Sequence, residues 1–501
     1  MLQALVFIAG MTSLAAEMSA SRLLEPYFGT SLFVWANIIG LILVYLSVGY
    51  YVGGRLADRY PRPQYLYSLT AVAAISLLLV PFIARPILRA SLLAFSTYSI
   101  GIFYGSLAGV ILLFAIPITL LGCVSPFAIR LAVEKVEQAG NVAGSLYALS
   151  TVGSILGTFV SVFFFIPTFG TARTIISFAV MLLIISALGL GKRLLWAGVA
   201  VGIVMALLPP GPIKGAPNMV YEHESPYNYI QVVRNGDEYD LLLNEGVAIH
   251  SIYHPGITLT RSYWDYVLVA PYFNPLHRAE QIKRVAIVGL AAGTMAKELT
   301  TVYGPMPIDG VEIDPSIVAV GRRFFDMHEA NIAVHETDGR YFMRTSPERY
   351  DLISLDAYHT PYIPFHLTTA EFFHELYDHT TDDGVVVANV GRTDRDSRLV
   401  EVIARTMGEA YPSVYIINVP APSGVEIRNS LVIGSRTAGS LGQATATLQG
   451  LQKPLLQGIA TQAVANVVEQ AKTPGLVFTD DHAPVEQLID QMILDYLQSA
   501  R

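Results

Sequence analysis

The feature that most constrains this chain is a series of apolar runs in its first 210 residues, each about 20 residues long. A helix of that length crosses the hydrocarbon core of a bilayer and satisfies all of its backbone groups internally. The runs predict about seven transmembrane helices, near residues 2–20, 31–53, 65–84, 100–121, 144–166, 171–190 and 193–209. We therefore expect residues 1–210 to form a multi-pass bundle in the cell membrane, with the lipid bilayer as partner.

The charged residues divide the chain into two parts of different character. Residues 1–210 hold 11 Lys and Arg against 5 Asp and Glu, whereas the rest of the chain holds 21 against 35. Such a contrast indicates two physically different modules. The acidic second part argues against nucleic acid as a partner, because phosphate binding needs a basic face. It is compatible with a cationic small molecule.

A change of hydrophobic pattern follows the linker signal at residues 209–212. Short alternating segments, with Asn235-Gly236 as a hairpin turn, predict a small antiparallel β domain over residues 215–270. From residue 283 strands alternate with helices, which indicates a mostly parallel, doubly wound sheet over residues 280–501. Strands are expected at 284–289, 307–313, 332–336, 351–356, 384–390, 413–418 and 429–435, and helices at 293–302, 315–325, 368–379, 396–411 and 482–499.

Four features fall at the carboxyl ends of successive predicted strands, which is the ligand edge of such a sheet. They are the small-residue turn that includes Gly289 and Gly293, then Glu312, then Asp338-Gly339, and finally Asp356. A bare backbone lets a ligand approach closely, and a carboxylate at the end of the second strand accepts ribose hydroxyls. Any one of them could be a turn or cap residue. Their order at consecutive strand ends predicts a nucleoside site.

A nicotinamide-binding domain is the main alternative for this pattern. It would place a pyrophosphate on the first turn and would require Gly-x-Gly-x-x-Gly. Here Ala291 and Thr294 stand at the second and third glycine positions. Acidic residues at Asp338 and Asp356 fit a nucleoside without pyrophosphate better.

These motifs resemble the spermidine synthase (polyamine aminopropyltransferase) family in its membrane-fused form. The resemblance is carried by Glu25–Ser31, Gly53–Arg59, Gly144–Ala148, Glu224–Ile230, Leu243–Gly246, Val311–Asp314, Asp338-Gly339, Tyr350–Asp356 and Leu367–Phe373. It implies an α/β methyltransferase-like (Rossmann-like) fold preceded by the small β domain. It also implies transfer of the aminopropyl group of decarboxylated S-adenosylmethionine to an amine, of the putrescine-to-spermidine type, with release of methylthioadenosine.

The same resemblance implies roles for individual residues. Glu312 matches the ribose carboxylate, Asp338-Gly339 the adenine site, Asp356 the proton acceptor, Tyr263 an active-site tyrosine, and Asn228 a nucleoside-contacting glutamine. The chemistry is consistent with these roles. A sulfonium already activates the carbon, so the enzyme needs an amine held in line and a carboxylate that takes its proton.

The chain departs from the family where the amine would be held. Ala292 stands where the family carries an Asp in the glycine loop, and His359 replaces a second Asp after the proton acceptor. Trp264 replaces a His or Gln and offers a cation–π face. We expect Trp264, Asp265 and His359 to line the place of the acceptor. Because a buried ammonium needs carboxylates, we expect a short diamine to bind more weakly than in the usual enzymes.

Other functions stay open at this stage. One is a different transfer or cleavage that uses intact S-adenosylmethionine, methyl transfer included, and another is a transporter or sensor that binds the nucleoside without turnover. We expect no metal, because the histidines lack HExxH-type spacing and Cys123 is the single cysteine. The acceptor and the assembly are undetermined, with a homodimer as one candidate.

The orientation of the bundle is subject to two opposing arguments. The Gly53–Arg59 stretch resembles a cytoplasmic loop of major facilitator transporters, and basic residues in alternate loops divide seven to four in its favour. Seven crossings from a cytoplasmic N-terminus would leave the second part outside. A nucleoside cosubstrate of this type is cytosolic, so we expect the soluble domain to face the cytoplasm.

One acidic cluster lies near the end of the chain. Thr479-Asp480-Asp481 precedes the helix expected near residues 484–500 and is typical of a helix N-cap. It also resembles a recurrent end motif of the fused family, so a role at the site stays open.

Overall fold

The structure is a computed structural model that describes residues 1–29, 32–95, 101–208, 211–246, 248–277, 282–358, 362–420, 427–470 and 474–499. It divides into two compact units. The helical unit comprises Met1–Pro217, Tyr221–Ile230 and Asn244–Gly246. The α/β unit comprises Asn218–Val220, Gln231–Leu243 and Val247–Arg501.

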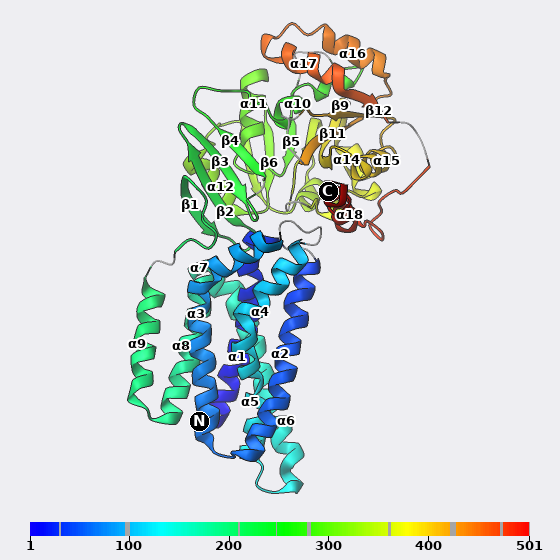
Figure 1. The fold of residues 1–501 in the computed structure, drawn as a ribbon. Coiled ribbons are helices and arrows are strands. Elements are labelled where there is room, and N and C mark those ends of the chain that lie inside the picture. Colours follow the sequence, from blue (N-terminus) through cyan, green and yellow to red (C-terminus); the bar gives the residue numbers. More distant parts are fainter. Residues whose placement is uncertain are drawn as a thin grey trace. The chain divides into compact units, whose positions relative to one another are not determined.

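The helical unit is an assembly of apolar helices (Figure 1). They are α1 (Leu2–Phe28), α2 (Leu32–Arg59), α3 (Pro63–Phe95), α4 (Gly101–Gly122), α5 (Val124–Ala132), α6 (Ala139–Val160), α7 (Ile166–Phe169), α8 (Thr171–Leu190) and α9 (Arg193–Leu207). Among the described residues, six helical stretches are long and apolar enough to cross a membrane. The seventh predicted run forms α9, whose 15 residues extend only about 22 Å.

Glycines bring α1 and α6 into close contact. A Cβ atom at Gly153 would lie 2.2 Å from the Phe7 carbonyl oxygen, and one at Gly157 would lie 2.2 Å from that of Met11. The two helices therefore run in the same direction and touch backbone to backbone, which is the packing that small residues permit in apolar surroundings. Gly144, also in α6, has nothing within 4 Å of its Cβ position.

The chain leaves the bundle at the end opposite Met1. The Tyr27 hydroxyl, near the end of α1, donates to the Ile213 carbonyl at 2.6 Å. The Thr171 amide, at the start of α8, donates to the Glu224 carboxylate at 2.8 Å. Ile213 and Glu224 of the helical unit therefore lie at this end. An odd number of helix passes separates them from the N-terminus.

A four-stranded sheet follows, in the order β1 (Met219–Glu224), β2 (Tyr229–Asn235), β3 (Glu238–Leu243) and β4 (Ile249–Tyr253). The hairpin predicted at Asn235-Gly236 is confirmed, because β2 ends at Asn235 and β3 begins at Glu238. Gly236 has a φ of +68°, a conformation that glycine adopts without strain. The small antiparallel sheet expected before the Rossmann-like domain is therefore present.

The α/β unit is built on an eight-stranded sheet in the order β12-β10-β11-β9-β8-β5-β6-β7. Its strands are β5 (Val285–Val288), β6 (Ile308–Glu312), β7 (Ile332–Glu336), β8 (Tyr350–Leu355), β9 (Thr380–Thr393), β10 (Ser413–Asn418), β11 (Ile427–Ser435) and β12 (Val467–Glu469). The five strands from β9 to β7 pair in parallel. The mostly parallel sheet is confirmed, whereas β10, β11 and β12 pair antiparallel, which the sequence pattern did not reveal.

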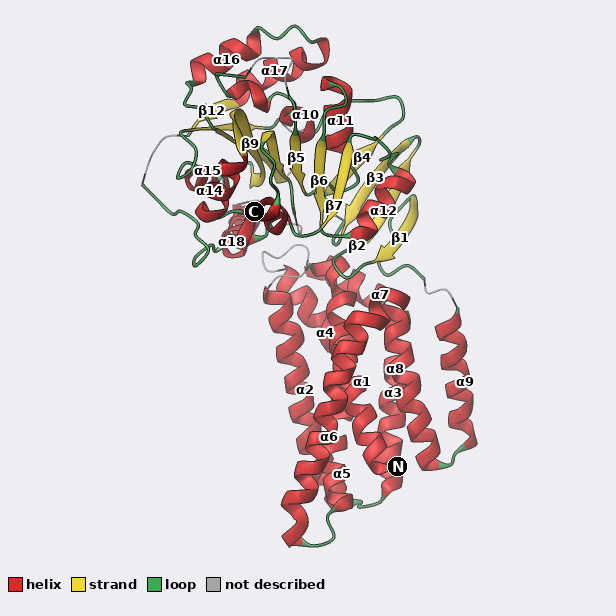
Figure 2. Cartoon of the chain, turned by 180° about the vertical axis from the view of Figure 1, so that it is seen from behind, coloured by secondary structure: helices red, strands yellow, loops and turns green. Residues whose placement is uncertain are grey.

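Helices cover both faces of this sheet (Figure 2). They are α10 (Tyr263–Val267), α11 (Thr294–Tyr303), α12 (Pro315–Phe324), α13 (Gly339–Thr345), α14 (Ala370–His379), α15 (Arg398–Met407), α16 (Leu441–Gln449), α17 (Pro454–Asn466) and α18 (Val485–Ser499). Alternate residues of β5 enter two separate cores. Val285 and Ile287 pack with α10, α11, α16 and α17, and Ala286 and Val288 pack with α13, α14, α15 and α18.

The expected helix cap near the end of the chain is wrong for Asp480. Helix α18 begins at Val485, five residues further on. The Asp480 carboxylate instead accepts hydrogen bonds from Arg340 at 2.7 and 2.9 Å. Asp480 therefore forms a tertiary ion pair instead of the helix cap that the local sequence pattern predicted.

The contact between α1 and α6 predicts opposite effects for two glycine substitutions in one helix. Gly157→Ala places a methyl group on the Met11 carbonyl and should lower stability by ~1–3 kcal/mol, the usual cost of overpacking. Gly144→Ala meets open space and should leave stability unchanged or raise it slightly, because Ala favours helix. Thermal unfolding in detergent measures both. Equal midpoints would show that α1 and α6 do not pack in this way.

Candidate active site

The turn after β5 presses against the chain that leaves β8. Gly289 has a φ of +92°, and a Cβ atom there would lie 2.5 Å from the Asp356 carbonyl oxygen and 2.6 Å from the Ala357 nitrogen. Gly293 also has a φ of +92°, with the Met327 sulfur 2.7 Å from its Cβ position. Both positions therefore require glycine, and the turn presents bare backbone at the carboxyl edge of the sheet.

Glu312 ends β6 next to this turn and is 7% exposed. One carboxylate oxygen accepts the Ala291 amide at 2.9 Å, and the other accepts the Asp314 amide at 3.1 Å. Burial raises the pKa of Glu312 to about 7, although these amides lower it. A carboxylate has about four acceptor sites, so both oxygens keep capacity for ligand hydroxyls.

Asp338-Gly339 lies where β7 gives way to α13. The Asp338 carboxylate caps α13 by accepting the Tyr341 amide at 2.9 Å, and its other oxygen lies 3.1 Å from the His366 Nε2 atom. A Cβ atom at Gly339 would lie 2.3 Å from the Val288 side chain. The turn is therefore held closely over β5. His366, which was not predicted as a site residue, contacts Asp338 at this turn.

Asp356 follows β8 and is surrounded by donors. One carboxylate oxygen accepts the Tyr263 hydroxyl at 2.9 Å and the Trp264 indole N–H at 3.1 Å. The other oxygen accepts the Asn389 amide at 2.8 Å. Burial raises the pKa of Asp356 to about 6, against the lowering effect of these three donors. Asp356 is therefore a fixed carboxylate that is ionised at neutral pH and ready to accept a proton.

Two residues of this cluster were not predicted from the sequence. Asn389 lies in β9, and its side chain also accepts the Asn429 amide at 2.8 Å. The Tyr358 hydroxyl donates to the Asn389 carbonyl and accepts the Gly391 amide, both at 2.9 Å. A polar residue inside the apolar run of β9 was the signal that could have identified Asn389.

Of the three residues predicted to line the place of the acceptor, two are described and one of these contacts Asp356. Trp264 binds Asp356 through its N–H. The Asp265 carboxylate accepts the Thr260 amide at 3.0 Å and the Arg261 amide at 3.1 Å, within its own loop. Burial, and then the neighbouring Asp265, raise the pKa of Glu298 well above its usual value. His359 lies outside the described residues.

Asn228 belongs to the helical unit. Its side-chain oxygen accepts the Asn244 side-chain amide at 3.1 Å, and its backbone N–H donates to the Ser225 hydroxyl at 2.8 Å. Its part in nucleoside binding stays a prediction.

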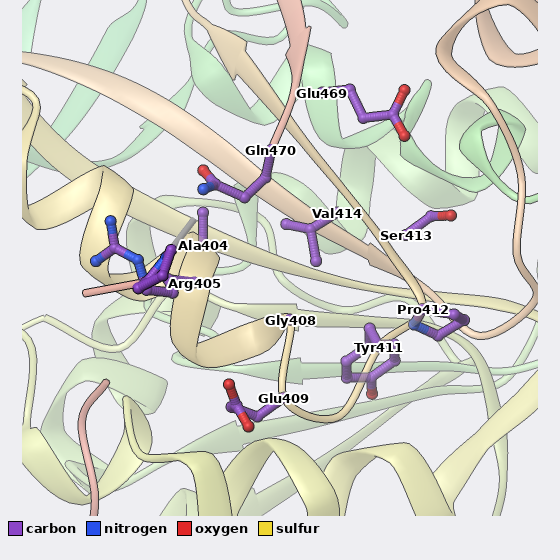
Figure 3. Close-up of a pocket in the computed structure, with 11 residues that line it drawn as sticks. Ala404, Arg405, Gly408, Glu409, Tyr411, Pro412, Ser413, Val414, Glu469 and Gln470 are labelled. Atoms are coloured by element: carbon purple, nitrogen blue, oxygen red, sulfur yellow. The ribbon is translucent and has the colours of Figure 1, made fainter. Parts of the chain in front are cut away.

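A surface pocket on another side of the α/β unit holds none of the predicted residues (Figure 3). It lies at the start of β10 and is lined by Arg405, Glu409, Tyr411, Glu469 and Gln470 among others. A small crevice lined by Leu355, Ala357, Tyr358 and Asn389 lies instead beside Asp356.

Comparisons with known proteins assign this domain. Residues 273–438 match the spermine/spermidine synthase domain. The chain is 30% identical over 295 residues to a probable polyamine aminopropyl transferase of Bifidobacterium longum, which covers 56% of this chain and 65% of that protein, less than two thirds of its length. It is 28% identical over 261 residues to the polyamine aminopropyltransferase of Vibrio vulnificus, covering 50% and 84%.

Solved structures of spermidine synthases also match part of this chain. A probable spermidine synthase from Corynebacterium glutamicum is 22% identical with a TM-score of 0.40, over 51% of this chain and 96% of that one. A spermidine synthase in complex with the transition state analogue AdoDATO is 17% identical with a TM-score of 0.38, over 49% and 84%. By the sequence match of residues 273–438, the chain carries a spermine/spermidine synthase domain, and it is similar to curated polyamine aminopropyltransferases.

Proposed function

We propose that this protein transfers the aminopropyl group of decarboxylated S-adenosylmethionine to an amine and releases methylthioadenosine. The observation that carries the proposal is Asp356, which three donors fix at the end of β8 and which is ionised at neutral pH. The comparisons support it, because the curated relatives are named polyamine aminopropyltransferases.

The residues at the strand ends fit the nucleoside part of this cosubstrate. Glu312 offers a buried carboxylate, held at the edge of β6, to the two ribose hydroxyls. Gly289 and Gly339 leave bare backbone on either side. Asp338 offers an acceptor for the amino group of the base, at the oxygen that His366 contacts. No step requires a pyrophosphate-binding loop.

Asp356 accepts the proton that the acceptor amine loses during the transfer. The lone pair of the neutral amine attacks the methylene carbon beside the sulfonium, the carbon–sulfur bond breaks, and its electrons make the neutral thioether of methylthioadenosine. The nitrogen loses a proton, which Asp356 accepts. The Tyr263 hydroxyl and the Trp264 N–H hold the carboxylate in place, so that its geometry is set before the amine arrives.

We also propose that the helical unit lies in a bilayer. Its outer faces carry exposed apolar side chains, such as Leu43 at 58%, Leu112 at 60% and Phe163 at 73% exposure. Large exposed apolar faces on long helices are stable in lipid and unfavourable in water. The protein is then a multi-pass membrane enzyme.

Two substitutions should separate binding from chemistry. Asp356→Asn removes the proton acceptor and should lower the transfer rate about a hundredfold to ten-thousandfold while methylthioadenosine still binds. Glu312→Gln should abolish that binding. Mass spectrometry of products and calorimetry with methylthioadenosine measure the two effects. S-adenosylhomocysteine as product would instead indicate methyl transfer, and binding without turnover would indicate a sensor or transporter.

The hydrogen bonds to Asp356 predict a shift of the pH profile. With a pKa of about 6, the base loses activity as pH falls through 6, because the carboxylate becomes protonated. Tyr263→Phe removes a donor that stabilises the ionised form, so the acid limb of kcat/KM should move to higher pH by about one unit. Tyr266→Phe, whose hydroxyl binds Gln462, is the matched control. An unmoved limb in Tyr263→Phe would remove Asp356 from the proton step.

The orientation of the protein is the remaining proposal. A cytosolic cosubstrate requires the catalytic domain in the cytoplasm. Ile213 and Glu224 lie at the end of the helical unit opposite Met1, so the N-terminus is then outside, against the seven-to-four division of basic residues.

Cysteine labelling of intact cells tests this orientation. Cys123 is replaced, and one cysteine is introduced at Asp237 in the turn after β2, or at Glu134 between α5 and α6. An impermeant thiol reagent should label Glu134→Cys and spare Asp237→Cys. The reverse result would place the catalytic domain outside the cytoplasm.

A further inference from the structure

Arg340 is a buried cation next to the predicted nucleoside site. It directly follows Gly339 in the first turn of α13 and is 6% exposed. A guanidinium in such a position must have its donors satisfied, since an unpaired buried charge is costly. Two carboxylates do this. The Glu375 oxygens accept from Nε and Nη2 at 2.7–3.2 Å, and the Asp480 oxygens accept from Nη1 and Nη2 at 2.7 and 2.9 Å.

Asp480 reaches Arg340 from a segment 140 positions later in the chain. Thr479 and His482 close a tight turn through two backbone hydrogen bonds, and Asp480 lies inside it. The Asp480 carboxylate also accepts the Thr369 hydroxyl at 2.7 Å, and its amide donates to the Glu371 carboxylate at 3.0 Å. The turn is therefore attached to the start of α14 as well as to α13.

The segment before this turn is anchored in the core. The Phe478 side chain is fully buried. The Phe478 carbonyl accepts the Ala370 amide at 2.9 Å, and its amide donates to the Thr406 hydroxyl at 3.0 Å. Asp480 is thus presented to Arg340 from a fixed position.

Arg340 connects this turn to Asp338 by two routes. Through the backbone it belongs to the same turn as Asp338-Gly339. Through its side chain, Nη1 donates to the His366 carbonyl at 3.1 Å, and the His366 ring lies 3.1 Å from the Asp338 carboxylate. Arg340 therefore fixes Asp338, which would accept a hydrogen bond from the adenine base, and the His366 ring, which contacts Asp338.

We propose that Asp480 is a positioning residue for the nucleoside: by holding Arg340 it fixes the Asp338-Gly339 turn and His366, and so it sets the affinity for the adenine-bearing cosubstrate rather than the rate of aminopropyl transfer. This inference rests on the proposed function. It assigns to the Thr479-Asp480-Asp481 segment a part in cosubstrate binding, although Asp480 itself does not touch the ligand.

The test compares two neighbouring carboxylates in the full-length protein in detergent. Asp480→Asn keeps the shape of the side chain and removes its charge. It should raise the Kd for methylthioadenosine and the KM for decarboxylated S-adenosylmethionine about tenfold, a size typical of substitutions within a coupled network. The kcat value should change less than about threefold. Asp481→Asn, at an exposed residue of the same turn, should change none of these values.

A third variant checks that the effect passes through Arg340. Arg340→Lys cannot make both paired contacts, so it should raise the same Kd. Combined with Asp480→Asn, it should add little, because both changes break one link.

Three outcomes would overturn the inference. In the first, Asp480→Asn binds methylthioadenosine as tightly as the unmodified protein. In the second, kcat and the thermal midpoint fall while KM stays unchanged, which is the signature of a purely structural role. In the third, the unmodified protein binds neither methylthioadenosine nor decarboxylated S-adenosylmethionine, and then the proposed function fails as well.

Discussion

The position of β5 between two parallel neighbours is the constraint on which the candidate site depends. Val288 pairs with Val311 of β6 on one side and with Leu355 of β8 on the other. The residues that follow these partners, Glu312 and Asp356, therefore emerge at one edge whatever their side chains are. The approach of Gly289 to the Asp356 backbone then locks the turn against β8, so the spacing of the two carboxylates is a property of the backbone.

That arrangement puts two acids where solvent is scarce, and the protein compensates each with donors. Burial raises the pKa of Glu312 to about 7 and that of Asp356 to about 6. Glu312 is held by backbone amides, which cannot be replaced by substitution. Asp356 is held by side chains from α10 and β9, which can be. In the proposed reaction, the position of Glu312 is therefore set by the backbone, whereas the pKa of Asp356 is adjustable through residues such as Tyr263 and Asn389.

Sequence patterns predicted what depends on periodicity and on position along a strand. The apolar runs became helices, and Glu312 and Asp356 were identified because each ends a strand. Pairings between distant segments were beyond such reasoning. The contact of Asp480 with Arg340 joins positions 140 apart, and the local pattern favoured a helix cap instead. Helices α16 and α17 escaped because their small and polar residues give a weak apolar stripe.

The charges at the carboxyl edge of the sheet bear on which amine could bind as acceptor. Ala292, where the family resemblance would place an Asp, is 1% exposed and neutral. The Asp265 carboxylate accepts hydrogen bonds from its own loop, and burial raises the pKa of Asp265. Asp356 is a carboxylate fixed at this edge that can attract a cation, and the Trp264 N–H donates to it. A second ammonium that leaves water needs a second carboxylate, and Ala292 does not supply one. We therefore propose an acceptor whose second charge is absent or lies far enough from the reacting nitrogen to stay in water.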